Sequence, residues 1–82
     1  MPGEQGVTAF ILMIIELGME YDVARRIREE IPAVKEVHVT YGEYDIVAKI
    51  VVGNLKELDE VVTKIRGMPG VKSTTTLISS GS

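Results

Sequence analysis

The stretch Val7–Ile15 is almost continuously apolar and rich in β-branched side chains, and Gly6 and Gly18 lie on either side of it. A strand with one wetted face would alternate polar and apolar residues, and this stretch does not. It therefore predicts a strand buried on both faces at the centre of a sheet. The stretch is too short to span a bilayer and lacks the basic flank of a signal peptide. We expect a soluble protein that makes no membrane contact.

A helix and a hairpin are predicted next. Residues 20–31 place apolar side chains at helical spacing, and Pro32 ends this helix. Residues 34–41 alternate and residues 44–52 are rich in β-branched side chains, which predicts two strands joined at Gly42 and Glu43. Taking Gly42 as the first central residue of a type II′ turn fixes the register. The resulting pairs are Tyr41 with Tyr44, Thr40 with Asp45, Val39 with Ile46, His38 with Val47, Val37 with Ala48 and Glu36 with Lys49.

The rest of the chain repeats the pattern of the first half. Asn54, with Glu57 three residues later, resembles a capping box at the start of a second helix, and residues 71–78 predict a last strand. Residues 31–35 (Ile-Pro-Ala-Val-Lys) have a counterpart in residues 68–72 (Met-Pro-Gly-Val-Lys), each at a helix-to-strand junction. The chain therefore consists of two similar β-α-β halves.

Right-handed crossovers in both halves give an α+β, ferredoxin-like fold. Its four-stranded antiparallel sheet has the order 4-1-3-2, and both helices cover one face. We expect one domain over residues 7–78, with flexible ends at residues 1–6 and 79–82. The other face carries Val47 and Val51 beside the apolar first strand. An uncovered apolar face usually marks association, so we expect a two-fold dimer that buries sheet against sheet, with a monomer as the alternative.

The composition excludes several classes of chemistry. The chain has no cysteine and a single histidine, His38, so a Cys/His metal site or an iron–sulfur cluster cannot form, and nothing marks a Ser–His catalytic pair. We expect no metal, no cofactor and no enzymatic activity. The absence of cysteine suits a reducing cytoplasm. Nine Lys and Arg against 12 Asp and Glu give a net charge of −3, so we expect no direct DNA binding.

Two clusters have simple structural interpretations. The arginines of residues 25–28 could form an anion site, but Glu29 and Glu30 stand one helical turn from two of them, which favours a solvated helix face. Three methionines, Met13, Met19 and Met68, are interpreted as packing residues rather than as thioether metal ligands.

The most distinctive segment is residues 40–45 (Thr-Tyr-Gly-Glu-Tyr-Asp). A plain hairpin turn is the simplest interpretation, because Gly and acidic residues are common in turns. Asp45, however, stands just inside a predicted strand, where Asp is disfavoured. We therefore interpret Asp45 as a residue that serves a binding partner.

Together with the Gly-Val and Thr-rich residues 70–78, the hairpin of residues 37–47 resembles the RAM effector-binding domain of the Lrp/AsnC transcriptional regulators. The resemblance covers nearly the whole chain and rests on a Gly-x-x-Asp hairpin. It implies a ferredoxin-like fold, dimers that assemble into rings, and a free amino acid bound near the hairpin between dimers. The implied ligand-binding residues are Thr40, Tyr41, Gly42, Tyr44, Asp45, Thr74 and Thr76.

A winged helix-turn-helix precedes this domain in the full-length regulators, and none precedes it in this sequence. We therefore expect a stand-alone member that acts alone or by co-assembly with full-length regulators. An amino-acid-binding ACT-type regulatory domain is the alternative of the same fold. A third class is a small enzyme on this fold, such as an acylphosphatase or a dimeric α/β-barrel monooxygenase. The single asparagine, Asn54, is better explained as a helix cap than as part of a phosphate loop.

Overall fold

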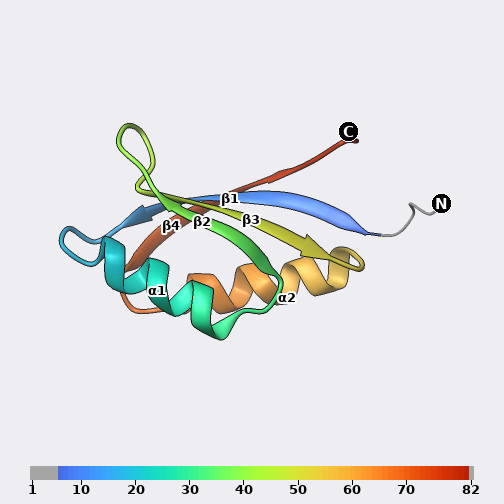
Figure 1. Cartoon of the computed structure of the whole chain (residues 1–82), viewed down its shortest axis with the longest axis horizontal. Coiled ribbons are helices and arrows are strands. Elements are labelled where there is room, and N and C mark those ends of the chain that lie inside the picture. The colour runs from blue at the N-terminus through green and yellow to red at the C-terminus, as the bar shows by residue number, and fades with distance from the viewer. Residues whose placement is uncertain (1–5, 82) are drawn as a thin grey trace.

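A computed structural model describes residues 6–81 and confirms the predicted order of elements (Figure 1). The four strands form one antiparallel sheet in the order β2-β3-β1-β4, which is the predicted topology, and both helices lie on the same side of it. The elements are β1 Val7–Ile15, α1 Glu20–Glu30, β2 Val34–Val39, β3 Ile46–Val52, α2 Leu55–Arg66 and β4 Val71–Ile78.

β1 is a central strand, as its composition predicts. It pairs with β3 on one side and with β4 on the other. Its side chains alternate between the two faces, and three of those directed toward the helices are fully buried: Ala9, Ile11 and Met13. Phe10, on the opposite face, is 36% exposed. The helices thus cover only one face of the strand.

The core lies between the sheet and the helices and is entirely hydrophobic over the described part of the chain. β3 contributes Ile46, Ala48 and Ile50, and the helices contribute side chains such as Ile27 and Ile65. Met13 and Met68 are buried in this core, and Met19 packs against it. The packing role predicted for the methionines is therefore confirmed.

The hairpin register is confirmed, but the turn is different from the one predicted. Val39 pairs with Ile46, and the strand pairs that precede it follow the predicted alignment as far as Glu36 and Lys49. A bulge between Val34 and Glu36 ends this alignment. The strands stop at Val39 and Ile46, so the predicted extension of pairing to Tyr41 and Tyr44 is wrong. Tyr41, in the loop beyond the last strand pair, is fully exposed.

Two of the three arginines of α1 pair with acids of the same helix, and the third, Arg28, donates to the Val37 carbonyl. Arg25 lies 2.6 Å from Asp22 and 3.4 Å from Glu29, and Arg26 lies 3.2 Å from Glu30. Hydrogen bonding to Asp22 and the charge of Glu29 raise the pKa of Arg25. The predicted solvated helix face is therefore what the structure contains.

Near the ends of the domain, the Ser79 N–H donates to the Thr8 carbonyl at 2.8 Å, which ties the chain after β4 to β1. Of the ends predicted to be flexible, residues 1–5 and 82 lie outside the described residues.

Asn54 caps α2 as predicted: its Oδ1 accepts the Glu57 N–H at 2.8 Å, and the Glu57 carboxylate accepts the N–H of Gly53. Asn54→Ala removes the acceptor and should lower the free energy of unfolding by about 1 kcal/mol. Asn54→Asp keeps an acceptor and serves as the control. Urea denaturation followed by circular dichroism measures both variants, and an unchanged midpoint for Asn54→Ala would contradict the assignment.

Candidate functional site

Asp45 fastens the β2–β3 loop to the end of β1. Its main-chain N–H donates to the Met13 carbonyl at 2.8 Å, and its Oδ2 accepts the Ile15 N–H at 2.8 Å. β3 begins only at Ile46, so no main-chain carbonyl of β3 lies opposite the Ile15 N–H. The Asp45 carboxylate accepts this hydrogen bond instead. An acidic residue beside a strand thus has a structural role here, in addition to any role in binding.

Thr40 closes the base of the same loop. Its N–H donates to the Asp45 carbonyl at 2.9 Å, and its hydroxyl donates to the Tyr44 carbonyl at 2.7 Å. The predicted two-residue turn does not form, because these bonds leave the whole of Tyr41–Tyr44 beyond the last pairing. Gly42 has φ +122°, the positive value expected of it, and an added Cβ would meet only open space. Backbone conformation, rather than crowding, is what requires glycine at this position.

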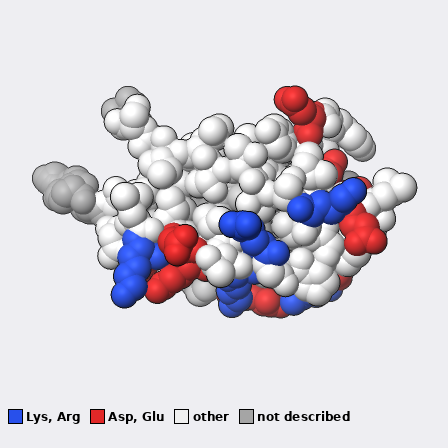
Figure 2. Space-filling view, turned by 180° about the vertical axis from the view of Figure 1, so that it is seen from behind, with Lys and Arg blue, Asp and Glu red and all other residues white. Residues whose placement is uncertain are grey.

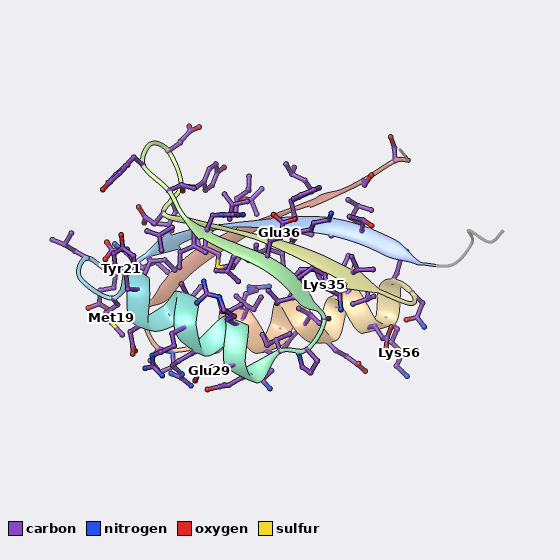
Figure 3. The ribbon with its side chains drawn as sticks, viewed as in Figure 1. Met19, Tyr21, Glu29, Lys35, Glu36 and Lys56 are labelled. Atoms are coloured by element: carbon purple, nitrogen blue, oxygen red, sulfur yellow. The ribbon has the colours of Figure 1, made fainter. Side chains whose placement is uncertain are left out.

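The loop forms one wall of an open hollow of about 420 Å³, a size within the range of small-molecule sites. The start of α1 forms the facing wall, and Figure 3 shows Tyr21 at the end of α1 that lies below the loop. The lining residues are Glu20, Tyr21, Val39, Thr40, Tyr41, Gly42 and Asp45.

The structure brings four of the predicted ligand-binding residues together at this hollow: Thr40, Tyr41, Gly42 and Asp45. Tyr44 is half-buried and does not line it. Thr74 and Thr76 lie on β4, where they pair with Met13 and Ile11 of β1. One whole strand therefore separates these two threonines from the hairpin within a subunit.

Glu20 and Tyr21 are lining residues that sequence reasoning missed. Both stand in the first turn of α1, where an acidic residue is explained by the helix dipole. No local pattern marks them as binding residues. Only the packing of α1 under the hairpin loop brings them to the hollow.

The hollow has the chemistry of a site for a small cationic group. Two carboxylates line it, those of Glu20 and Asp45, together with aromatic and aliphatic side chains, and none of the described lining residues is Lys, Arg or His. Over residues 6–81 no group of three or more His, Cys, Asp or Glu is placed to hold a metal ion. Nor, within the same residues, is any helix long and apolar enough for a membrane span.

A second surface of interest is the sheet face that the helices leave uncovered. Its apolar side chains come from β1, β3 and β4, and we call it the open sheet face: Phe10, Leu12, Ile14, Val47, Val51 and Leu77. In Figure 2 the charged side chains gather along the helical layer, and the part of the molecule above that layer is largely white.

Polar residues of β2 and β3 border the open sheet face. Glu36 accepts a hydrogen bond from His38 at 3.1 Å and lies 3.9 Å from Lys49. The His38 hydrogen bond, followed by the charge of Lys49, lowers the pKa of the Glu36 carboxyl. The predicted opposite-charge pair across these strands is therefore present, and it lies at the edge of the apolar patch.

Loss of the hydrogen bond between the Asp45 carboxylate and the Ile15 N–H should destabilise the fold. Asp45→Ala leaves the half-buried Ile15 N–H without its acceptor and should lower the free energy of unfolding by about 1–3 kcal/mol. Asp45→Asn keeps an acceptor and should lose less. Glu43→Ala removes an exposed acid of the same loop and serves as the control. Urea denaturation measures all three, and equal midpoints for Asp45→Ala and Glu43→Ala would show that this hydrogen bond contributes nothing.

The sequence of this chain matches a family model described as the Lrp/AsnC ligand binding domain over residues 8–82. The HTH-type transcriptional regulator FL11 of Pyrococcus horikoshii is 39% identical over 70 residues, which cover 85% of this chain and 46% of the regulator. The chain thus spans about half the length of the curated regulators that it matches. A homocitrate synthase of Sulfurisphaera tokodaii is 33% identical over 72 residues, which cover 88% of this chain and 16% of the enzyme.

Solved structures agree with this relationship. A hypothetical protein of Pyrococcus horikoshii has a TM-score of 0.84 and 44% identity, covering 93% of this chain and 92% of its own. A feast or famine regulatory protein of M. tuberculosis, solved in complex with L-methionine, has a TM-score of 0.76 and 23% identity, covering 93% of this chain and 51% of its own, and shows the fold alone. With a family model matched from the first strand to the last, the chain belongs to the Lrp/AsnC ligand-binding domain family.

Proposed function

We propose that residues 7–78 bind a free amino acid in the hollow between the β2–β3 loop and the start of α1. The observation that carries this proposal is the joining of Thr40, Tyr41, Gly42 and Asp45 at one hollow in a chain of this family. The regulator of the same fold solved with L-methionine supports an amino acid as the class of ligand.

The chemistry of the hollow fits the two ends of an amino acid. Main-chain N–H groups around Gly42 supply donors for the ligand carboxylate, as successive turn amides do in other anion sites. The Asp45 carboxylate uses Oδ2 for the Ile15 N–H and keeps Oδ1 for the ligand ammonium. In this proposal Tyr44 supports the loop through its carbonyl. Thr74 and Thr76 reach a ligand only from a neighbouring copy, because β1 separates them from the hollow.

Self-association completes the proposed module. The open sheet face presents apolar side chains from three strands, and a two-fold dimer would place it against itself. Dimers joined at their hairpin ends would close the hollow and build a larger ring. Neither step requires a residue outside the described part of the chain.

The proposed readout is regulation of transcription in the cytoplasm without direct DNA contact by this domain. A net charge of −3 disfavours binding to a polyanion, so the effect on DNA would pass through full-length regulators that co-assemble with it. The likeness to a segment of homocitrate synthase favours a second candidate, an amino-acid-sensing module that acts on an enzyme. In neither case does this domain itself catalyse a reaction.

Screening the twenty amino acids by isothermal calorimetry and thermal shift tests the proposed ligand class. At least one amino acid should raise the melting temperature, because a ligand that binds only the folded state stabilises it by mass action. The sharpest control is the amide of the best ligand, which retains the ammonium and removes the carboxylate. A panel in which no amino acid binds would overturn the proposal.

Val47→Asp tests the proposed dimer interface, because an unpaired carboxylate in an apolar interface costs several kcal/mol. The parent should elute as a dimer or larger species, and Val47→Asp should shift toward a monomer near 9.0 kDa. Leu55→Asp makes the same kind of change at an exposed position of α2 and should leave the assembly intact. Light scattering measures all three, and a monomeric parent would refute the interface.

A further inference from the structure

The two carboxylates of the hollow differ in what already engages them. Asp45 Oδ2 is bonded to the sheet through the Ile15 N–H. Glu20 makes one local contact, in which its Oε1 accepts the exposed Gly18 N–H at 3.1 Å. Glu20 therefore faces the hollow from the opposite wall without being needed to hold two elements together.

No cation of α1 offsets this charge. Arg25, on the turn after Glu20, is paired with Asp22 and Glu29. Among the described residues that line the hollow, the only charged groups are Glu20 and Asp45. A ligand group that enters the hollow thus meets negative charge from both walls.

We propose that Glu20 sets the charge preference of the site: it attracts ligands whose side chain is cationic and rejects amino acids whose side chain is acidic. This inference rests on the proposed function and deepens it, because it names the class of amino acid that the hollow admits. The ammonium of any amino acid can be satisfied beside Asp45, so Glu20 acts on the ligand side chain. Tyr21 and Val39 supply the apolar surface along which the stem of that side chain lies.

The expected size of the effect follows from the exposure of the hollow. Two unit charges several ångströms apart interact weakly where water reaches them, and pairs of this kind contribute modestly. We therefore expect Glu20 to change affinity by about three- to tenfold for each unit of ligand side-chain charge. Salt should reduce the effect, since exposed charges are screened.

Two isosteric pairs of probes isolate charge from shape: L-glutamate against L-glutamine, and L-lysine against 6-hydroxy-L-norleucine, in which a hydroxyl replaces the side-chain ammonium. Calorimetry on the full chain at pH 7 should show that glutamine binds more tightly than glutamate and lysine more tightly than 6-hydroxynorleucine. Glu20→Gln should reduce the affinity ratio within each pair by about three- to tenfold. The reason is that it keeps an acceptor for the Gly18 N–H and removes only the charge. Glu20→Asp keeps the charge and should preserve the affinity ratio within each pair.

Glu16→Gln is the matched control, because Glu16 is an exposed acid of the β1–α1 loop that does not line the hollow. The role of Glu20 would be overturned if the parent bound both members of each pair with equal affinity. It would also be overturned if Glu16→Gln reduced the affinity differences as much as Glu20→Gln does. If these probes bind but Glu20→Gln leaves the affinity differences within the pairs unchanged, the role of Glu20 fails and the proposed amino-acid site survives. If no amino acid binds the parent, the proposed function fails and this inference fails with it.

Discussion

The apolar character of β1 on both faces is the constraint on which the rest of this structure depends. β1 lies between β3 and β4, and on the face toward the helices Ala9, Ile11 and Met13 are fully buried. The other face presents Phe10, Leu12 and Ile14 with no helix over them. Apolar surface left in water forgoes about 25 cal/mol for each square ångström that could be buried. In the proposed dimer a second copy of the chain covers this face, because a two-fold axis makes one apolar patch complementary to itself.

The same strand also fixes the position of the candidate site. Where β3 diverges from β1, both the main chain and the side chain of Asp45 bond to β1. The loop before Asp45 therefore projects from a rigid sheet at a defined place. Binding residues on a loop gain precision from such support, because the scaffold restricts the conformations that the loop explores. The first contribution of Asp45 to the candidate site is therefore to fix the position of the β2–β3 loop through its hydrogen bonds to β1.

Periodicity predicts the elements and their order, and the placement of Gly42 and Glu43 at the centre of the turn predicts the hairpin register. Shifting the register by one residue would turn Val37 and Val39 to the wrong face, so the apolar pattern excludes such a shift. The turn type was not predictable, because the Thr40 hydroxyl and the Asp45 carboxylate compete with the backbone for hydrogen bonds. The position of Glu20 at the hollow is not predictable from the sequence either, since only tertiary packing brings the start of α1 to the loop.

Under the proposed function, assembly and ligand binding are linked at the hairpin end of the molecule. Around this end the large apolar side chains are strongly exposed: Tyr41 is 100% exposed, Leu17 93% and Tyr21 72%. Under the proposed function, a neighbouring subunit covers these side chains and closes the hollow at once. A ligand held between subunits then favours the assembled state, and assembly raises ligand affinity by the same factor, because coupling free energy is reciprocal. On this proposal, a small domain converts an amino-acid concentration into a change of oligomeric state.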